Sequence, residues 1–364
     1  MKQGWKTKKL FEVCDIVGGS TPKTNEPSYW NGEYYWVTPA ELNNEKYISF
    51  TQRTITNIGV KSAHLQLLPT GTVLLSSRAP IGKLAITTVP MYCNQGFKNL
   101  VCGKEIYNEY AYYFLLKNKD YLNSLGTGAT FKEISKRVVE QILIPFPSIE
   151  EQQRIVDILD KEFEKIDTLK ANAEKGLQYA KDLFWKILQK NFNGENCTLG
   201  DVLNLRRGHD LTHGEMLGGS IPVAGSGGII GYHNVASFIE PCITVGRSGS
   251  VGKVYVYDKC WAHNTVLYVD DFKGNNPYYL TYLLISLDLA KEKSGCGVPT
   301  LNRNYLHPIK IGFNFKQQEQ ENIVSNLDKL NEQCKVLQAN YEKTIALCDD
   351  MKQTLLRKAF NGEL

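Results

Sequence analysis

Several segments contain the residue types of known motifs, and their spacing decides what chemistry each can do. Gly246 to Lys253 has the glycines and the lysine of a phosphate-binding loop, but it is one residue too long for the Gly-x4-Gly-Lys-Ser/Thr pattern. Val254 also stands where that loop needs a hydroxyl group to hold magnesium. Nucleotide hydrolysis is therefore not expected from this segment.

Two further segments also fall short of a catalytic or metal-binding motif. Asn276 to Tyr279 is similar to the Asn-Pro-Pro-Tyr motif of amino-methyltransferases, but the second proline is missing and no glycine-rich cofactor loop follows a strand upstream. Proline is preferred at the first position of a helix, so Pro277 indicates a helix N-terminus instead. His209 and His213 are four residues apart, but glycines bracket them in a predicted loop and no acidic partner is fixed, so metal binding is not expected. No Pro-Asp pair is followed by the Glu-x-Lys of nucleases.

The elements that must position any site are organised around a repeat. Residues 150–195 match residues 318–363 at a constant offset of 168 without a gap, and 20 of the 46 positions are identical. Apolar or small residues recur every seven positions in both copies, and neither copy contains proline. Each copy is therefore predicted to be one long helix, and about 40 residues of helix are roughly 60 Å long.

Between the repeats lie two modules with a shared order of motifs. Short strand-like runs and few helices favour an α+β fold rather than a parallel doubly wound sheet. In both modules an Asn lies eleven residues after a Gly-Lys pair, at Asn94 and at Asn264. The predicted division is a first module over residues 1–147, a helix over 148–196, a second module over 197–315 and a helix over 316–364. The offset between the modules is not constant, which suggests that equivalent modules recognise different things.

Composition is typical of an ordinary globular protein, with 42% hydrophobic and 22% charged residues among 364. There is no run of 18 apolar residues and the first residues contain no apolar signal core, so a cytoplasmic protein is expected. The nine cysteines are never spaced as Cys-x2-Cys, which favours reduced thiols and argues against a zinc site.

Charge is distributed unevenly along the chain. Residues 1–147 carry 17 basic and 11 acidic side chains, and residues 197–315 carry 10 and 9. The two helical segments are slightly acidic, with 8 basic against 10 acidic side chains in residues 148–196 and 7 against 8 in residues 316–364. The positive charge therefore lies in the modules, where a phosphate-binding surface would be expected.

The order of these motifs resembles that of the specificity subunit of type I restriction-modification systems. The resemblance covers nearly the whole chain and rests on the Pro-Ile-Gly-Lys segment at 80–83, the Asn-Gln-Gly-Phe segment at 94–97, the Gly-Thr-Gly-Ala-Thr-Phe segment at 126–131, and helices that end in Phe-Asn-Gly-Glu. The second module departs from this pattern, since the Arg247 loop lacks the proline and His263 to Val266 replace Asn-Gln-Gly-Phe.

The resemblance implies two target-recognition domains, each recognising one half of a bipartite double-stranded DNA sequence across an unread spacer. It also implies an antiparallel coiled coil of the two repeat helices, which sets the spacer and docks two methyltransferase subunits. This chain would be non-catalytic and without a cofactor. S-adenosylmethionine would belong to the methyltransferase partner, and ATP and magnesium to the restriction or translocase partner.

DNA recognition needs phosphate contacts for affinity and base-edge contacts for sequence. In the first module Lys83, Lys98 and Lys132 are predicted to position phosphates, with backbone donors from the turn at residues 18–21. Arg78 suits guanine, and Asn94 or Gln95 suits adenine. The full set of candidates in this module is Ser20, Thr21, Ser77, Arg78, Lys83, Asn94, Gln95, Lys98 and Lys132.

In the second module the candidate residues occupy four segments in the same order. They are Arg206 and Arg207, then Arg247, Ser248 and Lys253, then His263 and Asn264, and finally Asn302 and Arg303. A simpler explanation stays open for each of them: Asn94 or Asn264 can cap a turn, and a Gly-Lys pair after a strand can be a solvated hairpin.

Two other classes of protein remain as alternatives. A self-contained DNA methyltransferase or nuclease would bind a cofactor or cleave DNA by itself. A coiled-coil binding scaffold without a nucleic-acid role would show no salt-dependent affinity for DNA.

Overall fold

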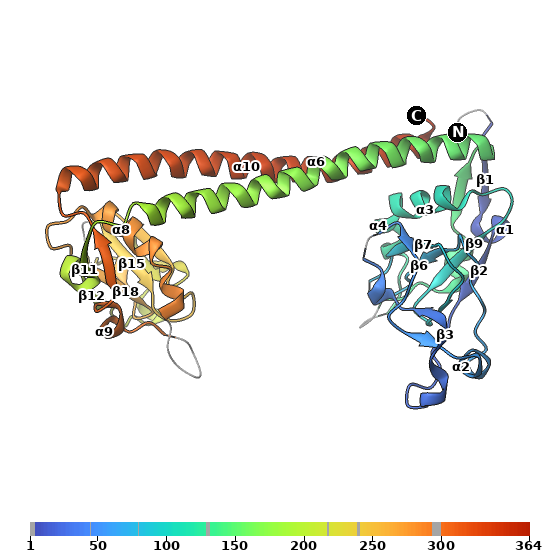
Figure 1. Cartoon of the computed structure of the whole chain (residues 1–364), viewed down its shortest axis with the longest axis horizontal. Helices are drawn as coiled ribbons and strands as arrows, with labels where there is room; N and C mark the ends of the chain where they lie inside the picture. The colour runs from blue at the N-terminus through green and yellow to red at the C-terminus, as the bar shows by residue number, and fades with distance from the viewer. Residues whose placement is uncertain are drawn as a thin grey trace. The chain divides into compact units, whose positions relative to one another are not determined.

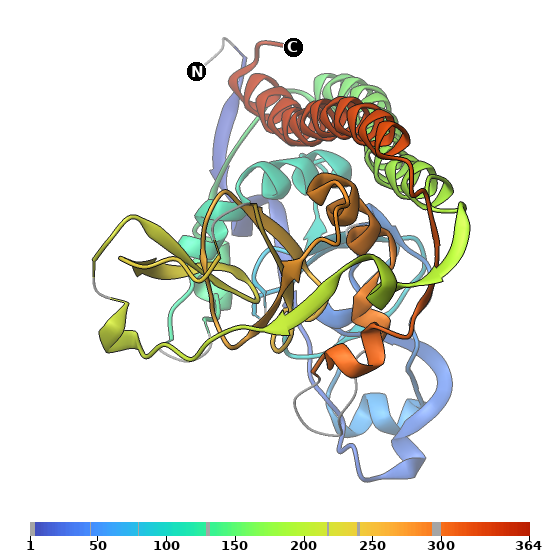
Figure 2. The same ribbon diagram turned by 90° about the vertical axis from the view of Figure 1, so that its left-hand side faces the viewer.

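The structure, a computed structural model, is drawn in Figure 1 and describes residues 4–43, 45–78, 80–128, 132–216, 218–238, 241–292 and 300–364. Its two long helices are α6 (Ile149–Lys190) and α10 (Gln317–Asn361), which lie side by side in Figures 1 and 2. Glu150 and Glu151 occupy the first turn of α6, where carboxylates favour the helix dipole, and Gly362 follows α10 with a φ of 74°. These are the helices that the repeat predicted.

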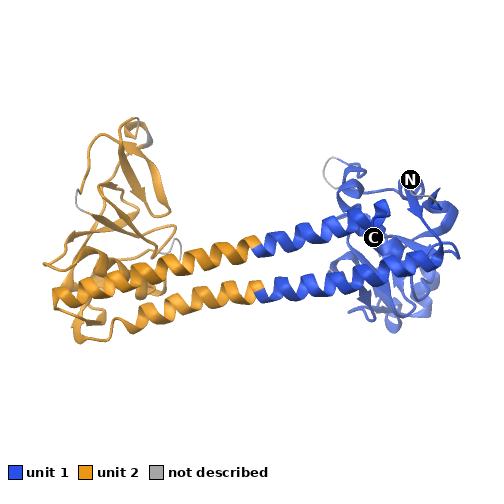
Figure 3. Ribbon diagram, turned by 90° about the horizontal axis from the view of Figure 1, so that it is seen from above, with its two compact units in different colours: residues 1–172, 344–364 blue, residues 173–343 orange. Residues whose placement is uncertain are grey.

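The chain divides into two compact units, coloured separately in Figure 3. The first unit contains residues 1–172 and 344–364, and the second contains residues 173–343. Each unit therefore contains the whole of one predicted module, together with part of α6 and part of α10.

Within each unit α6 and α10 run antiparallel. In the first unit Lys170 Nζ lies 2.7 Å from Asp349 and Lys352 Nζ lies 2.5 Å from Asp167, so residue numbers fall on one helix as they rise on the other. In the second unit a Cβ added to Gly176 would lie 2.4 Å from the ring of Tyr341, which shows how closely the helices approach. Exposed ion pairs of this kind each stabilise by only about 0–1 kcal/mol, so they specify the pairing more than they strengthen it.

The first module contains two mixed sheets and a separate strand pair. Their strand orders are β2-β9-β6-β7-β4, β5-β3-β8 and β1-β10. The strands are β1 (Lys6–Lys9), β2 (Cys14–Gly18), β3 (Trp30–Val37), β4 (Tyr47–Ile48), β5 (Thr54–Ile55), β6 (Val73–Leu75), β7 (Leu84–Thr87), β8 (Tyr92–Cys93), β9 (Lys98–Cys102) and β10 (Leu143–Phe146). The helices are α1 (Leu10–Val13), α2 (Asn57–Ser62), α3 (Asn108–Lys117), α4 (Lys119–Ser124) and α5 (Lys136–Glu140). The buried face of α3 joins the main core together with Leu159 of α6 and Leu356 of α10.

The second module repeats this plan with fewer strands. Its orders are β12-β18-β15-β16, β14-β13-β17 and β11-β19. The strands are β11 (Glu195–Thr198), β12 (Asn204–Arg207), β13 (Ile221–Gly225), β14 (Gly228–His233), β15 (Cys242–Gly246), β16 (Val254–Tyr257), β17 (Trp261–Ala262), β18 (Val266–Asp271) and β19 (Lys310–Phe313). The helices are α7 (Leu199–Val202), α8 (Pro277–Ser286) and α9 (Arg303–Leu306). In both modules a three-stranded sheet pairs its central strand parallel with one neighbour and antiparallel with the other, so the expected fold of two repeated α+β modules and two long antiparallel helices is confirmed.

The start of one long helix and the end of the other hold each module. In the first unit Asp160 of α6 accepts a hydrogen bond from Tyr113, and Phe360 of α10 lies 4.9 Å from Tyr110, measured between ring centroids. In the second unit the equivalent pairs are Asp328 with Tyr282, at 2.6 Å, and Phe192 with Tyr279, at 5.2 Å. Figures 1 and 2 show α8 lying against the long helices of its unit. The identical residues of the repeat therefore make equivalent contacts with the two modules.

The expectation that all nine cysteines are reduced is wrong for one pair. Cys242 and Cys260 form a disulfide with their Cα atoms 6.1 Å apart, a usual separation for such a bond. Sequence spacing could not reveal this pair, because β-sheet pairing brings together residues that are 18 positions apart. No described helix combines the length and the apolar composition that a membrane crossing requires.

Candidate nucleic-acid interface

The first module brings two predicted turns into contact at the end of β2. The backbone N–H of Ser20 donates to the carbonyl oxygen of Cys93 at 3.1 Å, and the hydroxyl of Thr21 donates to the side-chain oxygen of Gln95. A Cβ on Gly19 would lie 2.0 Å from that same carbonyl oxygen of Cys93. Only glycine permits this approach, so the turn positions Ser20 and Thr21 beside Gln95.

Asn94 and Gln95 have different environments within that turn. The side-chain oxygen of Asn94 accepts the backbone N–H of Gly96 at 2.9 Å, which is the turn-capping geometry that the sequence left open. Gln95 is exposed. Of the two amides predicted to contact adenine, Gln95 is therefore the better placed to reach a ligand.

The loop after β6 is attached to the same turn and carries two of the predicted basic residues, Arg78 and Lys83. Ser77 N donates to Gly96 O at 2.8 Å, which joins the loop to the turn. Lys83 Nζ donates to the carbonyl oxygen of Pro39 at 3.1 Å. The loop therefore lies next to the Asn94–Gln95 turn.

Glu133 modifies the charge of this surface, and the sequence analysis did not identify it. Its carboxylate lies 3.2 Å from Lys98 Nζ and 3.9 Å from a guanidinium nitrogen of Arg78. The Lys98 side chain is only 13% exposed and also donates to Ser77 Oγ at 3.2 Å, so Lys98 holds the loop in place. Arg78 is the more accessible cation of the two, with 37% of its side chain exposed. Lys132 is exposed, but residues 129–131 of its predicted segment lie outside the described residues.

The second module builds the same turn contact from different side chains. His209 N donates to Ala262 O at 2.7 Å, and a Cβ on Gly208 would lie 2.1 Å from the carbonyl oxygen of His263. The Asn264 amide donates to the carboxylate of Asp210, which also lies 3.9 Å from Arg207. Asp210 was not predicted, although its place directly after the Arg-Arg-Gly-His segment was a usable signal.

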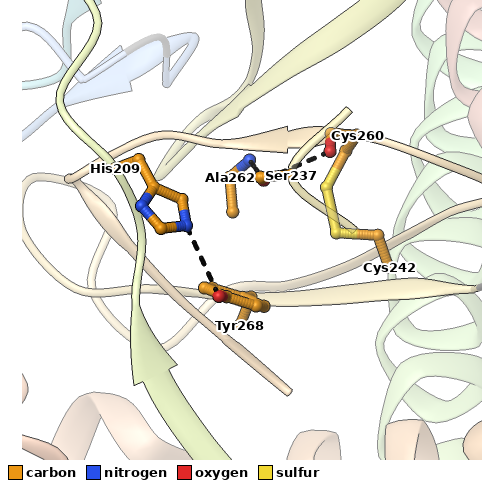
Figure 4. Close-up of a disulfide and its surroundings, with 6 residues drawn as sticks. All are labelled: His209, Ser237, Cys242, Cys260, Ala262 and Tyr268. Carbon is orange, nitrogen blue, oxygen red and sulfur yellow. Dashed lines mark hydrogen bonds between the residues drawn. A yellow bond between two sulfur atoms is a disulfide. The ribbon is translucent and has the colours of Figure 1, made fainter. Parts of the chain in front are cut away.

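Figure 4 shows what supports this turn. The side chain of His209 faces Tyr268, with Nε2 3.4 Å from the hydroxyl oxygen, and Ser237 Oγ accepts the backbone N–H of Ala262 at 2.7 Å. The Cys242–Cys260 disulfide lies beside them. Burial raises the pKa of Tyr268, so its hydroxyl stays neutral and can donate. The turn is therefore held by a partly buried polar and aromatic cluster.

Arg247 and Ser248 lie beside the turn that carries His263. Arg247 N donates to Thr265 O at 2.8 Å, and His263 Nδ1 lies 3.0 Å from Thr265 Oγ1. Lys253 is exposed on the same loop. The structure therefore brings together the predicted residues of three separate segments.

The remaining predicted residues are not joined to the turn by a hydrogen bond or an ion pair among the described residues. Arg206 is 3.5 Å from Asp270, while the side chain of Asn302 accepts from Asn304 N at 3.0 Å and caps α9. Arg303 is exposed. Residues 293–299, which include the Gly-Cys-Gly sequence at 295–297, lie outside the described residues, as does the side chain of His213.

The two modules are equivalent in a register that differs by one residue from the predicted one. Gln95 bonds to Thr21, the second residue after Gly19, and Asn264 bonds to Asp210, the second residue after Gly208. Gln95 therefore corresponds to Asn264. The earlier pairing of Asn94 with Asn264 is therefore wrong. The reason is a loop length: four residues, 88–91, join β7 to β8, whereas three residues, 258–260, join β16 to β17.

The same register places the two arginines at neighbouring positions. Ser77 and Arg247 each donate a backbone N–H to the turn and accept one from the segment that follows, from Ile134 and Leu301 respectively. Arg78 therefore corresponds to Ser248, not to Arg247. Because successive residues of an extended chain point to opposite sides, the two modules present their arginines differently.

In each module, the surface formed by these turns offers hydrogen-bond donors, hydrogen-bond acceptors and positive charge. These are the means by which proteins recognise nucleic acids. Among the described residues, no group of three His, Cys, Asp or Glu side chains is placed to hold a metal ion. Asn276, from the segment similar to the methyltransferase motif, caps α8 by accepting from Tyr278 N at 2.9 Å and Tyr279 N at 3.2 Å. That segment is the helix N-terminus that Pro277 indicated.

Comparison with known proteins identifies similar chains. The family model described as "Type I restriction modification DNA specificity domain" matches residues 2–178 and 193–345. The type I restriction enzyme MjaIX specificity subunit of Methanocaldococcus jannaschii is 38% identical over 207 residues, covering 55% of this chain and 48% of that protein. The match thus spans about half the length of that relative. The type I restriction enzyme EcoprrI specificity subunit of Escherichia coli is 25% identical over 351 residues, covering 88% of this chain and 86% of that protein.

Two solved structures share the fold. A chain from a study of complex assembly and conformational transition of the type I R-M system has a TM-score of 0.84 at 18% identity, covering 100% of this chain and 99% of that chain. The crystal structure of the HsdS subunit from Thermoanaerobacter tengcongensis has a TM-score of 0.65 at 17% identity, covering 100% of this chain and 98% of that chain.

Proposed function

This chain belongs to the type I restriction modification DNA specificity family, and on that premise we propose that it recognises a bipartite DNA target, one module for each half. The observation that carries the proposal is the pair of equivalent turn contacts, Thr21 with Gln95 and Asp210 with Asn264. The same backbone framework presents different hydrogen-bonding groups, which is what two half-sites of different sequence would require.

The two modules differ in charge as well as in side-chain type. The second module adds an acid to its turn at Asp210, and the first module has Glu133 beside its two cations. A carboxylate can accept a hydrogen bond from cytosine and orients a neighbouring arginine, whereas it repels phosphates. These acids support base recognition at the turns, while the exposed Lys132 and Lys253 are left for phosphate contacts.

We further propose that α6 and α10 set the unread spacer and dock two methyltransferase subunits. The repeated contacts at the helix ends support this, because identical residues hold two different modules in the same local way. In this proposal S-adenosylmethionine is bound by the methyltransferase partner, ATP and magnesium by a restriction partner, and this chain supplies no catalytic group. Methylation of an adenine requires the base to leave the stack, so a distorted duplex is expected between the modules and their partner.

The test is to co-express this chain with its methyltransferase partner and to map methylated adenines across the host genome. The expected result is one split motif, with a modified adenine in each half and a fixed unread gap. A stable complex in which the partner binds cofactor but no adenine is modified would reject DNA recognition and leave the helices as a docking scaffold.

A further inference from the structure

Arg53 in the first module has an unusual environment for an exposed arginine. Its guanidinium carbon lies 3.7 Å from the ring centroid of Trp30 and 5.2 Å from that of Trp36. The two indole rings are buried and meet edge to face, with centroids 5.0 Å apart and planes at 80°. The guanidinium therefore lies over Trp30 in a buried aromatic pair that limits its movement.

The hydrogen-bond donors of this guanidinium remain available. Arg53 is exposed, and its side chain has no hydrogen-bond or ion-pair partner within the described ranges. Glu41 lines a cavity of about 420 Å³ together with Arg53, but its carboxylate accepts from Thr38 N at 2.7 Å and Gln52 N at 2.8 Å. Glu41 is thus committed to the backbone, and Glu45, which also lines the cavity, makes no ion pair with Arg53 among the described residues, so Arg53 keeps its donors for a ligand.

The platform is attached to the candidate interface. Trp36 Nε1 donates to Ser20 O and Trp30 Nε1 donates to Lys23 O, each at 3.1 Å. The residue after Trp36, Val37, accepts the backbone N–H of Asn94 at 3.1 Å. Arg53 is therefore fixed beside the segment that presents Thr21 and Gln95.

We propose that Arg53 recognises a guanine in the half-site of the first module, a role that rests on the proposed function. A guanidinium matches guanine O6 and N7 with two parallel hydrogen bonds, and that match depends on the plane of the group. A phosphate contact tolerates a mobile cation, whereas a guanidinium held 3.7 Å from the centroid of a buried indole is suited to two acceptors in a fixed geometry.

No equivalent of this arrangement is found among the described residues of the second module. His263 N donates to Ala224 O as Asn94 N donates to Val37 O, so the position of Trp36 is taken by Val223. An aliphatic side chain cannot stack a guanidinium in this way. The contribution of Arg53 is therefore confined to one half of the target.

The experiment compares Arg53→Lys and Arg53→Ala with wild type in the co-expressed methyltransferase complex, with adenine methylation mapped genome-wide. Arg137→Ala is the matched control, because it removes one exposed arginine of the same module from α5, which carries none of the candidate residues. Co-purification of each variant with the partner reports folding. Arg53→Lys keeps the positive charge but loses the planar fork, so it separates base recognition from phosphate attraction.

We expect the wild-type motif to contain a guanine at one position that both Arg53 variants relax, with discrimination there falling roughly ten- to hundred-fold. The other half and the control motif stay unchanged. A uniform loss of methylation at an unaltered motif, rescued by Arg53→Lys, would identify a phosphate contact and overturn the inference. An unaltered motif in both variants would reject only the role of Arg53, whereas no methylation by wild type would reject the proposed function with it.

Discussion

Gln152, buried at the start of α6, accepts the backbone N–H of Tyr107, the residue that precedes α3, at 2.9 Å. Its amide nitrogen donates to the carbonyl oxygens of Glu105 and Pro147 at 2.9 and 3.0 Å. One side chain thus joins a long helix to the module, and Gln320 makes the equivalent contact with Asn276 N at 2.8 Å.

Replacing Gln152 with Ala should destabilise the first unit by about 2–4 kcal/mol, because three backbone groups at partly or fully buried sites lose their partner. Urea unfolding followed by circular dichroism measures this. Gln153→Ala is the control, since its side chain is exposed on the next position of the same helix. Equal midpoints for the two variants would contradict the structural role of Gln152.

Gly19→Ala should abolish recognition of one half-site, because its Cβ would lie 2.0 Å from the carbonyl oxygen of Cys93 and must displace the Ser20–Thr21 turn. Gly18→Ala is a matched control, with its nearest atom at 3.8 Å. Binding to a labelled duplex containing the mapped motif should fall at least about tenfold for Gly19→Ala. Similar affinities for the two variants would show that the turn is not part of the interface.

Gln95→Ala and Asn264→Ala should each relax a different half of the methylated motif, since these residues occupy equivalent positions in the two modules. The loss of discrimination at one base pair is expected to be about 1–3 kcal/mol. Genome-wide methylation mapping provides the comparison. Relaxation of the same half by both variants would refute one module for each half-site.

Protonation of His307 should lower the stability of the second unit. Burial, with smaller contributions from Arg303 and Lys273, lowers the pKa of His307 below its ordinary value of 6.5, and Nε2 accepts the backbone N–H of Leu205 at 3.0 Å. Since the folded chain disfavours the proton, this contribution is fully present above pH 6.5 and is lost as pH falls through the folded pKa.

The urea midpoint of wild type should therefore fall between pH 8 and pH 5 by more than that of His307→Gln. The difference between the two proteins isolates this group from the other titrating residues. A parallel pH dependence would show that the hydrogen bond to Leu205 survives protonation.

Removing one matched heptad from each long helix should shorten the unread spacer and leave both half-sites unchanged. Seven residues of helix are about 10 Å, or roughly three base pairs. Opposed segments are given by the ion pairs, since Asp167 faces Lys352 and Lys170 faces Asp349. Altered half-sites at a constant spacing would contradict a ruler role for the helices.

The sequence determined the long helices and the repeated plan because both depend on local or periodic signals. The seven-residue recurrence of residues such as Leu159 and Ile166 requires only that one face of a helix be buried, and both are buried. Glycines beside hydroxyl and amide residues likewise identified the two turns. Pro277 correctly marked the first residue of α8.

The equivalence and the accessibility of the side chains in those turns depend on tertiary contacts. A one-residue difference in a strand connection pairs Gln95 with Asn264, and Glu133 reaches the turn of the first module from a segment whose place in space no local pattern records. Arg53 had no motif, because its platform is formed by two tryptophans whose indoles are tied to Ser20 and Lys23 through long-range hydrogen bonds. Local periodicity thus specified the elements, while strand pairing and loop length specified the surface that they present.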